Sequence, residues 1–319
     1  MLLSAYNKLV RDYPNEVSSN KLYGMSLGST VPKLWLSVDS DLHPSLLFET
    51  QEALVKSNIE LRSISVYFSR YCSFETISAD VKSGIYTIVK INECEIETLQ
   101  VVFKLLEEVF IREGVSHSNR EIASIITEIA DLFAHVTSSK GDIIGLWGEL
   151  YILSFAPNLD RVVKYWCTSK TAKYDLVLPD FALEVKSTTN AKRKHRFSLE
   201  QVRPLGEFKV YIASLLLVET YSGQTAMELM ELLSSKIQNS ELRASFLKLC
   251  MLKGGVDLGR SSLKLGTLPE GGALVVFESK DMAAPEVKLG TGIENVRFDI
   301  DLSNLESSIA IEVGSLLEF

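Results

Sequence analysis

A short stretch in the middle of the chain, residues 174–188 (YDLVLPDFALEVKST), restricts the fold more than any other feature of this sequence. It predicts two strands joined by a turn at Pro179 and Asp180. Because side chains alternate between the two faces of a strand, one face of this hairpin is wholly apolar. That face consists of Tyr174, Leu176, Leu178, Phe181, Leu183 and Val185. We therefore expect the hairpin to be mostly buried.

The opposite face of the hairpin carries charge. If the turn pairs Leu178 with Phe181, the register places Asp175 directly opposite Glu184. Opposed residues have Cβ atoms about 4.5 to 5.5 Å apart, and like charges in that position destabilise a sheet. A cation is therefore expected between the two carboxylates, either Lys186 on the same face or a divalent metal ion. A plain cross-strand salt bridge on a solvated face is the alternative.

Composition narrows the kind of metal and the kind of protein. The four cysteines stand singly, without a C-x-x-C pair, and there are only four histidines, whereas the carboxylates offer oxygen ligands. Mg²⁺ or Mn²⁺ is therefore expected rather than zinc. The longest apolar runs, such as 210–218, are shorter than the roughly 20 residues of a membrane helix. We expect a cytoplasmic protein without a membrane partner.

The distribution of charge is compatible with a nucleic-acid partner. A formal net charge of −8 excludes a protein that is basic over its whole surface. Residues 161–209, however, hold eleven Lys and Arg against five Asp and Glu. A local basic surface is therefore expected around the hairpin.

Hydrophobic periodicity divides the chain into four regions. Residues 1–95 are rich in β-branched and aromatic runs and predict a β-rich N-terminal region. Residues 96–139 repeat apolar residues at helical intervals and predict a helical connection. The expected core covers 140–220, and 221–319 predict a C-terminal α/β extension.

The elements around the hairpin follow a recognisable order. They are a helix over 141–156, a strand over 161–169, the hairpin, a polar basic loop over 188–196, a short helix from Ser198 and a strand over 208–219. This order resembles the PD-(D/E)XK nuclease superfamily, whose fold is the restriction-endonuclease-like fold. The segment GLWGELYIL is especially similar to an uncharacterised branch that is often encoded near bacterial phage-defence genes.

The resemblance implies an α/β (α+β) fold, with a restriction-endonuclease-like core whose mixed central sheet is flanked by helices, a β-rich N-terminal region and a mixed C-terminal region. It also implies a Mg²⁺-dependent (or Mn²⁺-dependent) DNA endonuclease acting in restriction or phage defence. A catalytically silent DNA-binding or assembly subunit of a defence complex is the alternative, and a protein-binding scaffold is a third. A homodimer stays open because many relatives cut as dimers, and so does an ATPase or methyltransferase partner.

The resemblance also assigns residues. Asp175 and Glu184 would be the metal-binding carboxylates, and the carbonyl of Val185 would add a ligand. Lys186 would orient or activate the attacking water. The usual Pro-Asp dipeptide is replaced here by Tyr174-Asp175, a departure that is common in the superfamily.

Two further polar residues each have a structural alternative. Gly145 and Gly148 remove bulk beside Glu149, and many relatives use a Glu of this helix as an extra metal ligand; an exposed helix glutamate is the alternative. Gln201 resembles a catalytic polar residue on the second helix of related nucleases. The spacing Ser198-x-x-Gln201 is also that of a capping box, which would only anchor the helix.

Phosphate contacts are expected beside the Glu-x-Lys strand, where a DNA backbone would pass. Such contacts supply salt-dependent, sequence-independent affinity. A solvated charged loop is the alternative. The expected nucleic-acid-binding residues are Lys173, Lys192, Arg193, Lys194, His195 and Arg196.

Overall fold

The computed structural model describes residues 1–14, 22–28, 34–52, 57–92, 95–111, 117–138, 140–166, 172–204, 208–267, 272–286, 295–305 and 312–318. The chain divides into two compact units. The first combines Met1–Gly141 with Gly254–Arg260, and the second combines Asp142–Lys253 with Ser261–Phe319. Within the described ranges, no helix has both the length and the apolar character that crossing a membrane requires.

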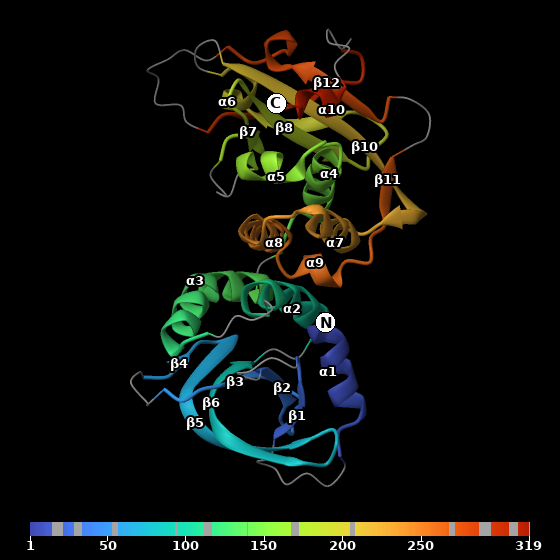
Figure 1. Ribbon diagram of the computed structural model, residues 1–319. Helices are drawn as coiled ribbons and strands as arrows, with labels where there is room; N and C mark the ends of the chain where they lie inside the picture. Colours follow the sequence, from blue (N-terminus) through green and yellow to red (C-terminus); the bar gives the residue numbers. More distant parts are fainter. Residues whose placement is uncertain are drawn as a thin grey trace. The chain divides into compact units, whose positions relative to one another are not determined.

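The first unit is built on a sheet that closes on itself (Figure 1). Its strands are β1 (Leu22–Ser26), β2 (Leu34–Val38), β3 (Pro44–Glu49), β4 (Ile59–Glu60), β5 (Ile64–Thr76) and β6 (Val81–Ile91). They are ordered β1-β2-β3-β6-β5-β4, and β1 also pairs in parallel with β5. Five strands therefore form a ring, in which Trp35, Leu47, Phe74 and Tyr86 make a core cluster.

The helices of the first unit are α1 (Leu2–Arg11), α2 (Ile96–Phe110), α3 (Asn119–Ser138) and α9 (Asp257–Arg260). In α1 the buried residues are Leu2, Ala5, Tyr6 and Leu9, the spacing of one apolar helix face. Residues 96–139, where the sequence predicts a helical connection, thus contain α2 and α3 of this unit.

A mixed sheet forms the centre of the second unit. Its strands are β7 (Leu176–Val177), β8 (Phe181–Thr188), β10 (Lys209–Gln224), β11 (Leu265–Thr267) and β12 (Leu274–Glu278). The order is β11-β10-β8-β7, with β12 also paired to β10. Only β8 and β10 run parallel, and the other pairs are antiparallel. A separate two-stranded ribbon joins β9 (Lys194–Ser198) to β13 (Arg297–Asp301).

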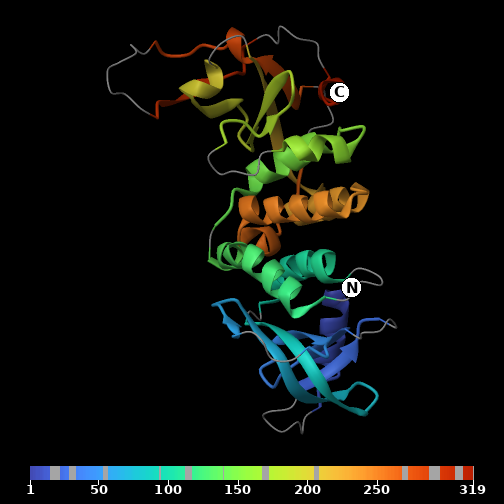
Figure 2. The same cartoon turned by 60° about the vertical axis from the view of Figure 1, so that its left-hand side comes forward.

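Helices cover this sheet on one face. They include α4 (Ile143–Leu153), α7 (Ala226–Lys236) and α8 (Ser240–Gly254), and both views place α4 between the sheet and the other two (Figures 1 and 2). The shorter helices of the unit are α5 (Leu159–Val162), η1 (Val163–Tyr165), α6 (Leu199–Val202), η2 (Ser279–Asp281) and α10 (Val313–Leu316). On the other face, Phe197 of β9 and Val202 of α6 pack in one cluster with Ala182, Val210 and Ile212 of the sheet.

Two glycines of α4 are needed for different reasons, one at β8 and one at the start of the helix. A Cβ on Gly148 would lie 1.8 Å from Ser187 Oγ, so this position lets the helix approach the strand closely, as the sequence predicts. Gly145 has another role. Its amide donates to the Asp142 side chain at 2.8 Å, and a Cβ there would lie 2.5 Å from the same carboxylate. Gly145 therefore makes room for the N-cap of α4.

The mixed α/β fold expected from the sequence is confirmed, with two local corrections. The strand predicted over 161–169 is wrong for its described part, because Asn158 accepts a hydrogen bond from the Arg161 amide at 3.1 Å and starts α5. Only Trp166 retains a strand-like bridge, to Leu176, and 167–171 lie outside the described residues. The basic loop predicted over 188–196 is also partly wrong, because its end forms β9.

Candidate active site

The hairpin has the register that its sequence predicts. Leu176 pairs with Leu183 across the turn. Asp175 directly precedes Leu176, and Glu184 directly follows Leu183, so both carboxylates lie at the same level of the hairpin. The assumed turn at Pro179 and Asp180, together with the alternation of side chains, was enough to predict this register.

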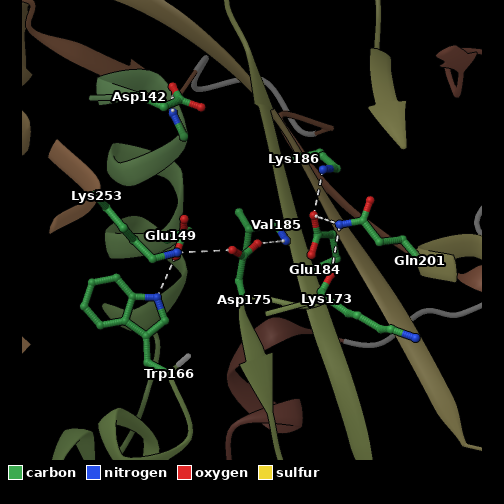
Figure 3. A network of polar contacts seen from close by, with 11 residues as sticks. Asp142, Glu149, Trp166, Lys173, Asp175, Glu184, Val185, Lys186, Gln201 and Lys253 are labelled. Carbon is green, nitrogen blue, oxygen red and sulfur yellow. Dashed lines mark hydrogen bonds and ion pairs between the residues drawn. The ribbon is translucent and has the colours of Figure 1, made fainter. Parts of the chain in front are cut away.

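The polar residues surround one edge of β8 (Figure 3). Ser187 faces α4, so Glu184 and Lys186 project from the opposite face of the strand. There the Lys186 Nζ lies 5.4 Å from the ring centre of Phe197 in β9. Glu149 approaches from α4. Asp175 lies at the strand edge between the two groups.

Asp175 is tied to the strand and to a helix by different oxygens. Its Oδ2 accepts a hydrogen bond from the Val185 amide at 2.8 Å. Its Oδ1 lies 3.4 Å from the Nζ of Lys253, in the last turn of α8. The backbone bond fixes Asp175 beside the Glu-x-Lys segment, although β7 itself is only two residues long.

Glu184 is almost completely buried, with 5% of its surface exposed. Its Oε1 accepts hydrogen bonds from Lys186 Nζ and from Gln201 Nε2, each at 2.6 Å. Lys186 is therefore the cation that neutralises Glu184, one of the two possibilities that the sequence left open. Lys253 is the corresponding cation beside Asp175.

Glu149 lies in the interior, not on an exposed helix surface. Its Oε2 accepts from the indole Nε1 of Trp166 and from Lys253 Nζ, each at 2.6 Å. Trp166 is held in turn by Phe246 of α8, with ring centres 5.4 Å apart. The glutamate is thus fixed by donors from two separate segments.

Gln201 contacts both the start of its helix and Glu184, so its two alternative roles are compatible in one side chain. Its Oε1 accepts from the Ser198 amide at 3.0 Å, which completes the capping box of α6. Its Nε2 donates to Glu184 and to the Lys173 carbonyl, the latter at 3.0 Å. The Lys173 side chain points elsewhere and pairs with Glu200 at 3.1 Å.

Burial dominates the electrostatics of the site. Burial, reinforced by the nearby charge of Asp175, raises the pKa of Glu149 and of Glu184 to about 8. Burial by itself would lower the pKa of Lys253, but Glu149 and Asp175 more than offset it and the pKa is raised. The two lysines therefore compensate the carboxylates incompletely.

Comparison with known proteins identifies the family. The model of the family described as "Putative PD-(D/E)XK family member, (DUF4420)" matches residues 36–303, most of the chain. The chain belongs to this family. No curated protein and no solved structure matches it.

The fold brings together the residues to which the sequence resemblance assigns the PD-(D/E)XK motif. Asp175 precedes β7, and Glu184, Val185 and Lys186 lie in β8. The chemistry of these donors suits Mg²⁺ or Mn²⁺, which prefer carboxylate and carbonyl oxygens. Asp175, Glu184 and Glu149 are instead paired with lysines, and they are not among the described groups of three whose ligand atoms lie within 4.8 Å of one another. The donor types fit a divalent ion, but their present spacing does not enclose one.

A different cluster meets that distance criterion. Among the described residues, Asp39, Asp41 and His43 of the first unit place one ligand atom each within 4.8 Å of one another. Asp39 already accepts from two backbone amides of the same loop and from Lys90 Nζ at 2.7 Å. These bonds account for the cluster as a turn stabilised by an aspartate.

Two of the expected phosphate-binding residues lie inside the unit. Arg193 Nη1 donates to the carbonyl and the hydroxyl of Ser214, at 2.7 and 2.9 Å, and Nη2 donates to the Gly272 carbonyl. His195 Nε2 shares a hydrogen bond of 2.7 Å with the same hydroxyl. Burial, followed by Lys186 and Arg193, lowers the His195 pKa to about 4. We therefore correct the expectation for Arg193 and His195, which turn inward because β9 alternates.

The other basic residues of this segment, Lys192, Lys194 and Arg196, are exposed. In the ribbon, Lys194 stands opposite Asp301 and Arg196 opposite Asp299. Lys194 Nζ also lies 3.7 Å from Asp299 Oδ2. The exposed cations remain candidates for phosphate contacts, with two of them partly balanced by aspartates.

Lys253 and Trp166 are the site residues that the sequence did not reveal. Lys253 lies far along the chain from Asp175, next to a Gly-Gly pair at the end of a helix, where a basic residue has an ordinary explanation. Trp166 falls in the segment predicted as a strand. Lys253 reaches Glu149 from the last turn of α8, whose Phe246 packs against Trp166, and Trp166 reaches it from the residue after η1.

Proposed function

We propose that this protein is a metal-dependent DNA endonuclease, which hydrolyses phosphodiester bonds by the attack of water and without a covalent intermediate. The observation that carries the proposal is the meeting of Asp175 with Glu184 and Lys186 around one strand. These are the residue types of the motif from which the PD-(D/E)XK family takes its name. A buried glutamate, Glu149, stands beside them.

The balance of charge supports a requirement for a cation. Three carboxylates, those of Asp175, Glu184 and Glu149, share two lysines, and both glutamates are buried. Buried charges are stable only when they are paired or bound to a metal, so one more cation suits this set. When bound, a divalent ion lowers the pKa of water and offsets the charge that develops on the phosphate.

The residues of the site would have separate roles in binding the metal ion and in positioning water and phosphate. Asp175, Glu184 and the carbonyl of Val185 are the donors available to Mg²⁺ or Mn²⁺. Glu149 has the chemistry of a further donor, but in this structure its carboxylate is paired with Lys253. Lys186 keeps its ammonium 2.6 Å from Glu184 with part of its surface exposed, a position suited to orienting water and holding a phosphate oxygen. Gln201 fixes Glu184 in the orientation that this contact needs.

DNA is the substrate in this proposal, and restriction or phage defence is its setting. Exposed basic residues on and beside β9 favour a polyanionic substrate. The setting comes from the family resemblance and is a separate part of the proposal.

The test is cleavage of supercoiled plasmid and of single-stranded DNA with Mg²⁺, Mn²⁺ or EDTA. Wild type is compared with Glu184→Gln and Lys186→Met. The chain offers a matched control, because Glu278 and Lys280 have the same spacing and form an ion pair of 2.8 Å away from the hairpin. Cleavage that needs the metal, is lost in both site variants and persists in Lys280→Met is expected.

The alternative is a catalytically silent DNA-binding or assembly subunit. No cleavage with any metal, together with salt-dependent DNA binding that survives Glu184→Gln, would favour that alternative. Cleavage that is equal in wild type and in Lys186→Met would overturn the proposed site.

A further inference from the structure

Asp175 lies between two carboxylate–lysine groups (Figure 3). On one face of β8, Lys186 contacts Glu184 at 2.6 Å. On the α4 side, Lys253 contacts Glu149 at 2.6 Å and Asp175 Oδ1 at 3.4 Å. The site therefore contains a second lysine that the PD-(D/E)XK motif does not include.

Lys253 is held in place by several independent contacts. Its carbonyl accepts from the Asp142 amide at 3.2 Å, which joins the end of α8 to the start of α4. Its Nζ lies 5.6 Å from the ring centre of Trp166, within the range of a cation–π interaction. Two turns earlier, Phe246 packs against the same indole. A surface lysine would have no such fixed position.

The position of this ammonium matters for metal binding. Two-metal nuclease sites hold their ions roughly 3.5–4 Å apart, and each ion needs carboxylate oxygens at about 2.0–2.1 Å if it is magnesium. An ammonium that contacts both Glu149 and Asp175 takes up the space between them and supplies positive charge there. Lys253 and an ion cannot share that space.

We propose that Lys253 is a built-in cation on the Glu149 side of Asp175, in the place of a second metal ion, so that the site takes one divalent ion, between Asp175 and Glu184. The inference rests on the proposed metal-dependent function. It makes Lys253 a positioning residue, because the lysine acts through the two carboxylates. It also makes Glu149 the anchor of Lys253 and not a metal ligand.

The test counts Mn²⁺ ions bound to the whole protein, by titration with the free Mn²⁺ signal followed by electron paramagnetic resonance. Wild type is expected to bind one ion in the second unit. Lys253→Met exposes the Glu149 and Asp175 carboxylates to a second ion and is expected to bind two. Lys253→Arg restores the fixed charge and returns the count to one, and the control Lys280→Met leaves it at one.

A second comparison does not depend on the folding of Lys253→Met, which circular dichroism would check. Glu184→Gln removes a ligand and is expected to weaken Mn²⁺ binding by roughly tenfold or more. Glu149→Gln is expected to weaken Mn²⁺ binding less than Glu184→Gln does, because Glu149 contacts Lys253 and is not a ligand in this proposal. Equal losses in the two variants would overturn the inference.

The outcomes separate this inference from the proposed function. Two ions in wild type, or one ion in a folded Lys253→Met protein, would overturn the one-ion site while the metal-dependent function stands. No Mn²⁺ binding in wild type would instead contradict the proposed function itself. Loss of the wild-type ion in Asp39→Asn, with Glu184→Gln unaffected, would place the ion in the first unit and overturn both.

Discussion

Gln201 and Glu184 are joined by a hydrogen bond of 2.6 Å from the side-chain amide to the buried carboxylate. The other end of the same amide caps α6 by accepting from the Ser198 backbone. The short helix and the Glu-x-Lys strand are therefore fixed by one side chain. A change at Gln201 should disturb both, whereas a change at Ser198 should disturb only the helix.

Ser198→Ala and Gln201→Ala should separate these two functions. Loss of an N-cap side chain lowers the free energy of unfolding by about 1 kcal/mol. Gln201→Ala should lose about as much from the cap and a further ~2 kcal/mol, because a buried acceptor loses a donor. Urea unfolding of the two variants measures the difference. Equal losses would mean that the Glu184 contact contributes nothing.

Gly148→Ala should push α4 away from β8. The new Cβ would lie 1.8 Å from Ser187 Oγ and 3.2 Å from Leu215 Cδ1. Such overpacking typically lowers the free energy of unfolding by about 1–3 kcal/mol. Adding Ser187→Ala removes the closest atom and should recover part of the stability. A Gly148→Ala protein as stable as wild type would show that the helix can shift freely.

The metal-free protein should become less stable as the pH rises. The pKa values of Glu149 and Glu184 are raised from 4.5 to about 8, so between these values the folded protein holds more protons than the unfolded chain. The free energy of unfolding therefore falls with increasing pH. Glu184→Gln should flatten that slope by up to about 1.4 kcal/mol per pH unit. Urea unfolding in EDTA across this range is the measurement, and a wild-type slope no steeper than that of the variant would contradict it.

The sequence was sufficient for the register of the hairpin because a turn centred on Pro179 and Asp180, combined with strict alternation of side chains, leaves one pairing. Had Asp175 slipped by a single residue, the apolar face of the hairpin would have turned to solvent. Gly148 likewise signalled the close approach that buries Glu149. These features depend on residues that are neighbours along the chain or across one turn.

The sequence did not predict the features of the structure that depend on packing between segments distant along the chain. Val162 and Val163 have a high propensity for strands. The N-cap at Asn158 and the burial of both valines stabilise helical turns instead. Lys253 reaches the site only because α8 docks beside Trp166. The inward turn of Arg193 and His195 depends on pairing with β13, about a hundred residues further along the chain.

Substitution should lower the free energy of unfolding at Arg193 and leave it almost unchanged at Lys192. Arg193 donates to the carbonyl and the hydroxyl of buried Ser214, so Arg193→Met removes a donor from buried polar groups. Each such group costs about 1–3 kcal/mol of unfolding free energy. Lys192 is exposed, and Lys192→Ala should change stability by less than about 0.5 kcal/mol.

DNA binding should show the reverse pattern for these neighbours. If Lys192 contacts a phosphate, Lys192→Ala should weaken binding about equally for all DNA sequences and reduce the slope of log K against log salt by about 1. A folded Arg193→Lys protein should keep the wild-type slope, because Arg193 is not available to DNA. Fluorescence anisotropy at several salt concentrations measures both slopes. A reduced slope for Arg193→Lys alone would show that the buried arginine becomes exposed when DNA binds.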